Sequence, residues 1–196
     1  MGSQLPRDLF HLIKETPELD WQLLTKRPQN IARMLPADWG QGYPNVWLGI
    51  TAEDTDRFRA RWPILSRMPA ARRFVSYEPA IAPLGAIDIG QANCLPDWII
   101  CGGESGGGAR PMHPAWARHV RDQCHALGIA FLHKQWGTYR SNPLMQEDGL
   151  SPAEAKRRDP PANGKGGALF DGRLYREFPG ERHAEINAPS RVSLLR

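Results

Sequence analysis

The chain has 196 residues, 41% of them hydrophobic, seven tryptophans and a formal net charge of +4, which excludes a disordered chain and fits one domain with a small appendage. No run approaches the ~18 apolar residues of a membrane span, so we expect no membrane partner. The mild positive charge permits a nucleic-acid partner without indicating one. Cys94, Cys101 and Cys124 lack C-x-x-C spacing and a secretion signal, which indicates reduced thiols and a cytoplasmic protein.

Five short apolar runs predict β-strands. Each contains β-branched or aromatic residues and stops at a polar residue, a glycine or a proline. They lie at residues 20–28, 45–53, 72–80, 97–105 and 129–137. The runs are nearly continuous rather than alternating, which is typical of strands buried on both faces of a parallel sheet.

Helical patterns are predicted between the strands, at residues 6–20, 27–36, 51–68 and 113–128. Pro28 and Pro114 suit first helical turns, and Gly128 suits the position just after a helix. The alternation predicts an α/β fold with right-handed crossovers and a parallel sheet. The strand spacing of ~25–30 residues fits a (β/α) barrel or a doubly wound sheet.

The amino-acid composition changes after residue 137. Proline, glycine, lysine and arginine dominate residues 138–165, which we predict to be an irregular loop. Asp171-Gly172 predicts a hairpin within 166–178, packed on the barrel of residues 1–137. Residues 179–196 are expected to be a weakly ordered tail.

Each predicted strand carries an ionisable group where it ends. Because the carboxyl ends of parallel strands converge on one rim, these groups predict a binding site for a small charged ligand. Alternatively, the charges merely mark where the strands reach water. The candidate ligand-binding residues are Lys26, Arg27, Glu53, Glu78, Gly102, Gly103, Glu104, Lys134 and Gln135.

The stretch ICGGESGGGARPMHP joins the fourth strand to a helix. Its glycines allow close approach of a ligand and offer N–H groups to an anion, with Glu104 fixing a donor such as an amino group. The alternative is a tight turn that needs positive φ. The stretch is neither a P-loop nor a Rossmann fingerprint. Ser105 also fits the five-residue form of a nucleophile elbow, which leaves a serine hydrolase as a weak alternative.

No catalytic residue can be assigned from the sequence. The histidines are scattered, and no His-Glu-x-x-His motif or Cys/His cluster is present, so no metal site is expected. The basic run 156–158 supports a second hypothesis, a non-enzymatic module that binds nucleic acid or a partner protein. Whether the chain is an enzyme stays open.

The phrases WQLLTKRP, NVWLGIT, RFVSYEP, DWIICGGESGGGARPMHPAW and FLHKQWG occur in this order between residues 8 and 178. Together they resemble a phage and mobile-element family often called the gp thirty-seven / gp sixty-eight proteins, a domain of unknown function. That family looks like a radical S-adenosylmethionine-type partial barrel. The resemblance implies that longer members bind S-adenosylmethionine and an iron–sulfur cluster, held by a Cys-rich segment on their first strand.

This sequence departs from the family pattern at its start. The Cys-rich segment and the first strands are absent, and the three cysteines present do not match the family's positions. A cluster requires three or four thiolates brought together, so no cofactor is expected in this chain. The resemblance therefore predicts the C-terminal portion of an incomplete parallel (β/α) barrel of about five strands. Its open edge would suit a partner polypeptide that supplies the missing strands.

Overall fold

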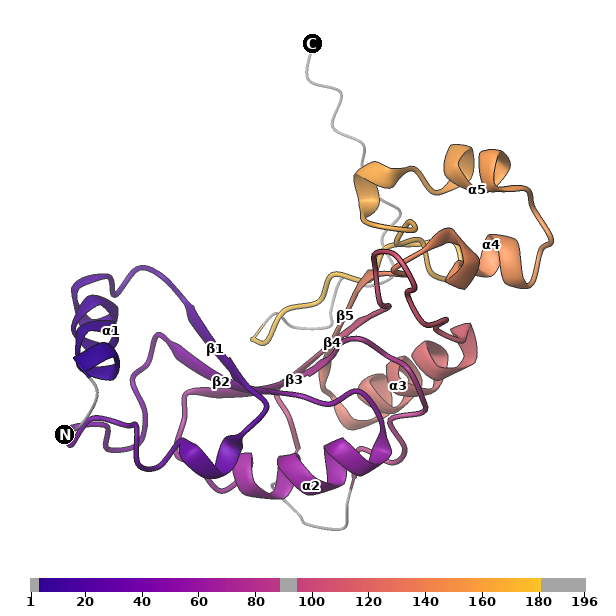
Figure 1. Ribbon diagram of the computed structural model, residues 1–196. Helices are drawn as coiled ribbons and strands as arrows, with labels where there is room; N and C mark the ends of the chain where they lie inside the picture. Colours follow the sequence, from indigo (N-terminus) through magenta and orange to yellow (C-terminus); the bar gives the residue numbers. More distant parts are fainter. Residues whose placement is uncertain (1–3, 89–94, 181–196) are drawn as a thin grey trace.

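A computed structural model describes residues 4–88 and 95–180 and contains one parallel β-sheet (Figure 1). All five predicted strands are confirmed. The order in the sheet follows the order in the chain, so the described part has no reversal of strand order and no topological switch point. The strands are β1 (Trp21–Thr25), β2 (Val46–Thr51), β3 (Arg72–Tyr77), β4 (Trp98–Gly102) and β5 (Ala130–Gln135).

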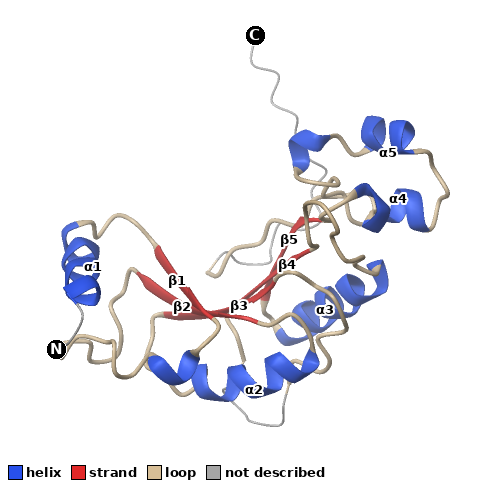
Figure 2. Ribbon diagram, in the orientation of Figure 1, coloured by secondary structure: helices blue, strands red, loops and turns tan. Residues whose placement is uncertain are grey.

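Three longer helices accompany the sheet: α1 (Gln4–Glu15), α2 (Thr55–Leu65) and α3 (Pro114–Leu127). Helices α2 and α3 lie on the same face of the sheet, and the sheet curves away from them, so that its opposite face is concave (Figure 2). Asp54 caps the start of α2 by accepting a hydrogen bond from the Arg57 N–H. Gly128 ends α3 in the left-handed region, as predicted.

Two predictions from the sequence were wrong in detail. Residues 27–36 form only one 3-10 turn, η1 (Pro28–Asn30), because the short segment ending at Pro36 offers too little buried surface to hold a helix. The predicted irregular loop at 138–165 contains two short helices, α4 (Pro143–Gln146) and α5 (Pro152–Arg158), with single turns η2 (Tyr139–Ser141) and η3 (Pro161–Asn163).

The two faces of the sheet have different cores. Leu48, Ile50, Val75, Ile99 and Phe131 belong to a large buried cluster on the side of the helices. The concave face carries a smaller cluster built on Phe74, Trp98 and Ala130, with Trp47, Ile100 and Leu132 packed against it. The alternation of side chains along a strand therefore assigns every second residue to the concave face.

The C-terminal segment closes one edge of the sheet. Phe170 and Arg173 form an antiparallel bridge around the predicted Asp171-Gly172 turn. Arg176 then bridges Leu132, and the His133 N–H donates to the Tyr175 carbonyl at 3.1 Å, so this segment runs antiparallel along β5. The outer edge of β1 has no strand partner among the residues described. Most of the predicted tail, residues 181–196, lies outside the described residues.

Candidate functional site at the carboxyl ends of the strands

The sheet register sets two glutamates at one level of the rim. Thr51 pairs with Ser76, and each is followed two residues later by a glutamate, Glu53 and Glu78. Ser76 also pairs with Ile100, which places Gly102 level with Glu78. Cys101 pairs with His133 but Gly102 pairs with Gln135, so the register shifts at Lys134. The sheet therefore brings residues from four strands to the same edge.

Glu78 and Lys134 form an ion pair across this edge. The Nζ atom of Lys134 lies 3.1 Å from Oε2 of Glu78. The lysine side chain is 60% exposed, whereas that of Glu78 is 18% exposed. A Cβ atom at Gly102 would lie 3.0 Å from the same Oε2 atom, so the glycine leaves room for the carboxylate. The pair thus joins a largely buried anion to an accessible cation.

Glu53 has two close cationic partners, and a third cation, Arg57, lies 3.9 Å from its Oε2 atom. Lys26 Nζ lies 2.7 Å from Oε1, and Arg61 of α2 donates to Oε2 at 2.9 Å. Burial acts to raise the pKa of Glu53, but the hydrogen bond from Lys26 and the charge of Arg61 outweigh it, and the pKa is lowered. Arg61 also donates to the Thr51 carbonyl at 2.8 Å. Helix α2 therefore holds this carboxylate in its ionised form at the rim.

Two buried polar groups near the rim lack a partner among the described residues. The Thr51 hydroxyl, at the end of β2, makes no hydrogen bond. The Gln135 side chain donates from Nε2 to the Gly103 carbonyl at 2.9 Å, but its Oε1 atom accepts nothing. Unpaired buried polar groups are costly and suit a ligand that completes their bonds.

The glycine-rich loop is fixed at both ends. A Cβ atom at Gly103 would lie 2.1 Å from the Trp136 carbonyl oxygen, so backbone packs directly on backbone. Glu104 accepts hydrogen bonds from the Arg110 N–H, Nε and a terminal nitrogen at 2.8, 2.8 and 2.6 Å. These bonds lower the pKa of Glu104 to about 2. Both carboxylate oxygens are thus engaged within the loop itself.

Two other candidates lie apart from the Glu53–Glu78 level. Arg27 lines a groove beside β1, together with Ile31 and Leu35. Ser105 is exposed in the eleven-residue connection 103–113, which is longer than a sharp strand-to-helix turn, and no described residue hydrogen-bonds its hydroxyl. Sequence reasoning did not include Thr51, Ser76 or Arg61 among the site residues. The alternation Trp47, Gly49, Thr51 could have placed Thr51 on the face of the rim.

The described cysteines do not fit an iron–sulfur cluster at this rim. Cys101 and Cys124 are buried in the large core on the side of the helices. Burial raises the pKa of both thiols well above the ordinary value, and both side chains belong to that core rather than to the rim. Cys94 lies outside the described residues.

The fold and the rim define an α/β protein with a five-stranded parallel sheet and charged groups at the carboxyl ends of its strands. Residues 2–179 match the family described as Protein of unknown function (DUF5131), and the chain belongs to that family. No curated protein and no solved structure matches the chain. None of the described helices is both long enough and apolar enough to cross a membrane.

Proposed function

We propose that the chain is an incomplete (β/α) barrel whose rim binds a small zwitterionic ligand, one that carries an ammonium and a carboxylate group. The sequential strand order, the helices on one face and the curvature of the sheet support the barrel (Figure 2). In such folds ligands bind at the carboxyl ends of the strands, where Glu53, Glu78 and Lys134 lie.

The Glu78–Lys134 pair carries this proposal. Among the described residues, Lys134 is the ion-pair partner of Glu78, and no second hydrogen bond reaches that carboxylate. An incoming ammonium group can take the place of the lysine on Glu78 while the ligand's carboxylate takes Lys134. Such an exchange replaces one ion pair with two and keeps the buried carboxylate neutralised throughout.

S-adenosylmethionine is the first ligand to test, because it carries these two groups and the resemblance to radical S-adenosylmethionine-type proteins implies it. Radical chemistry would also need a cluster, and the two described cysteines lie in the core rather than at the rim. The proposal for this chain is therefore binding. No reaction step is assigned to its residues.

Isothermal titration calorimetry with S-adenosylmethionine and with methionine tests the proposal. We expect Glu78→Gln and Lys134→Gln each to weaken binding by roughly tenfold, the value of one charge-assisted hydrogen bond. Glu15→Gln, at an exposed position of α1, is the matched control and should bind as the unaltered chain does. Equal affinities in all four proteins, or no heat with either ligand, would refute the proposal.

The free edge of β1 supports a second candidate function, docking of a strand from a partner polypeptide. A groove of about 540 Å³ lies beside this edge and is lined by Leu9, Phe10 and Leu23. Leu24, on β1 itself, is 49% exposed. An unpaired apolar edge strand favours pairing with another chain. Leu24→Asp should make the isolated chain more soluble. If the β1 amides that point away from β2 exchanged slowly with solvent hydrogen at every protein concentration, the edge would not be free.

A further inference from the structure

A second groove, of about 590 Å³, lies between the glycine-rich loop and the C-terminal helices. Gly106 and Gly108 line one side of it, and Tyr139, Arg140 and Lys156 line another. We call it the cationic groove, because its charged lining residues are Arg140 and Lys156. No carboxylate lines it. It is therefore a different kind of site from the rim, where each cation is paired with a glutamate.

Neither cation of the groove is neutralised within the described part of the chain. Arg140 and Lys156 are both exposed and form no ion pair there. Nearby carboxylates have other partners: Glu104 is held by Arg110, and Glu154 accepts hydrogen bonds from Ser151. Two unpaired cations on one groove favour an anion that reaches both.

The glycine-rich loop adds backbone donors to this groove. Gly106 and Gly108 have φ angles of 115° and 73°, a region that other residues rarely adopt. A Cβ atom added at either glycine would meet nothing within 4 Å, so the surrounding space is open. The N–H groups of residues 105–108 donate to no described residue. The hydrogen bonds between Glu104 and Arg110 join the two ends of the loop. Free amides on such a loop form a concavity suited to anions.

One aromatic ring completes the groove. The Tyr139 hydroxyl donates to the Asp159 carbonyl at 2.8 Å, which fixes the ring. Lys156 Nζ lies 5.7 Å from the centre of that ring. Cations beside an aromatic face are the combination that binds a phosphate and stacks the base attached to it.

We propose that the cationic groove binds the phosphate groups of a nucleotide or of single-stranded nucleic acid. Arg140 and Lys156 would contact phosphate oxygens, and the loop amides would donate to the same oxygens. The Tyr139 ring, which Lys156 would leave for the phosphate, would then face the base. The two sources share the same phosphate chemistry, and the experiment separates them.

The test measures binding of pyrophosphate and of a short fluorescent oligothymidylate, the latter by anisotropy at low and at moderate salt. We expect Arg140→Gln and Lys156→Gln each to weaken oligothymidylate binding by roughly tenfold. Arg157→Gln and Arg158→Gln are matched controls, since both residues lie on α5 but do not line the groove. Glu15→Gln, at an exposed position of α1 outside both sites, is expected to leave pyrophosphate binding unchanged.

Each outcome decides the proposal. Pyrophosphate binding with shifts of the Gly106 and Gly108 amide signals supports the groove in the unaltered protein, without any variant. If the oligothymidylate binds more tightly and loses affinity steeply with salt, the source is a nucleic-acid backbone. If only pyrophosphate binds, the source is the phosphate chain of a free nucleotide. Failure of both probes to bind, or equal losses in the Arg157 and Arg158 variants, would overturn the proposal.

Discussion

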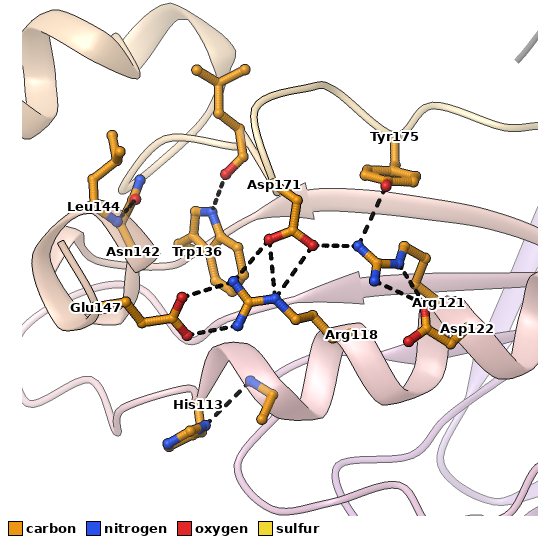
Figure 3. A network of polar contacts seen from close by, with 12 residues as sticks. His113, Arg118, Arg121, Asp122, Trp136, Asn142, Leu144, Glu147, Asp171 and Tyr175 are labelled. Carbon is orange, nitrogen blue, oxygen red and sulfur yellow. Dashed lines mark hydrogen bonds and ion pairs between the residues drawn. The ribbon is translucent and has the colours of Figure 1, made fainter. Parts of the chain in front are cut away.

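Arg118 of α3 and Asp171 of the C-terminal turn are joined by three hydrogen bonds at 2.8, 3.0 and 3.3 Å, although they lie 53 positions apart in the sequence. The same guanidinium donates to both oxygens of Glu147 at 2.6 and 2.8 Å. Arg121, one turn further along α3, also contacts Asp171 (Figure 3). This network fastens α4 and the C-terminal turn to the helix that covers β4 and β5.

Removing Arg118 is expected to destabilise the protein. In Arg118→Ala, Glu147 loses its guanidinium partner and Asp171 keeps only Arg121, so we expect the free energy of unfolding to fall by about 1–2 kcal/mol. Urea unfolding followed by tryptophan fluorescence measures the change. Arg59→Ala, at an exposed position of α2, is the control and should be within about 0.5 kcal/mol of the unaltered chain. Similar values for both variants would show that the network contributes nothing measurable.

Asp159 also joins segments that are distant in the sequence, because hydrogen bonds to its carboxylate come from both sides of the segment that follows α5. It is fully buried and accepts hydrogen bonds from the side chains of Asn142 and Asn163 and from the N–H groups of Ala168 and Leu169. Asp159→Ala would remove the acceptor of three donors and one of the two acceptors of Asn142, at a cost of about 3 kcal/mol or more.

The readouts for Asp159→Ala are urea unfolding and limited proteolysis. We expect cleavage within residues 160–169 to appear in this variant while the sheet remains intact. Asp148→Ala removes an exposed carboxylate from the same region and is expected to leave the cleavage pattern unchanged. A pattern shared by both variants would contradict the anchoring role.

His133 is expected to make stability depend on pH. Its ring is buried against Trp136 and Phe170, and neither ring nitrogen has a partner among the described residues. Burial, and then the charge of Arg176, lower the pKa of His133 to about 3. The folded state therefore keeps the imidazole neutral, whereas the unfolded chain takes up a proton below about pH 6.5. The free energy of unfolding therefore includes the full contribution of the neutral His133 above pH 6.5 and loses it as the pH falls toward 3.

Urea midpoints between pH 7 and pH 5 test this prediction. The slope from one such group approaches about 1.4 kcal/mol per pH unit, and most carboxylates remain ionised over this range. His133→Leu should flatten the dependence, whereas His119→Gln, at an exposed position of α3, should keep it. A His133→Leu protein with the original slope would assign the effect to other groups.

Gly103 and Gly107 belong to the same loop but should respond differently to alanine. A methyl group at Gly103 meets the Trp136 carbonyl, and backbone at the end of β5 has little freedom to move away. We expect Gly103→Ala to cost about 2–3 kcal/mol in urea unfolding. Gly107 has open space and no positive φ, so Gly107→Ala should be close to neutral. Equal stabilities would show that the close approach is easily relieved.

The sequence predicted the strands well because each is a short apolar run with a clear stop. It predicted α3 for a similar reason, since Pro114 and Gly128 mark both ends. The start of α5 carried a signal too: Ser151 and Glu154 form a capping box, as the spacing Ser-x-x-Glu suggests. The many prolines and glycines of residues 138–165 nevertheless led to the prediction of a loop. Composition averages over a whole segment and does not show where a single short helix begins.

The candidate site could be predicted only as a set of strand ends. The pairing of Glu78 with Lys134 follows from the adjacency of β3, β4 and β5 in the sheet. This adjacency is what a sequential strand order predicts. The pairing of Glu53 with Arg61 depends on how α2 sits on the sheet, and no sequence spacing specifies that. The capture of Glu104 by Arg110 depends on closure of a glycine-rich loop, whose many allowed conformations the sequence does not narrow.

The antiparallel run of Tyr175, Arg176 and Glu177 along β5 determines how far copies of this sheet could associate. Because the C-terminal segment occupies the edge of β5, the free strand edge in the described part of the chain is that of β1. Two copies meeting there would pair their β1 strands about a twofold axis. In such a pair no strand could add directly to β5 unless the C-terminal segment first left it.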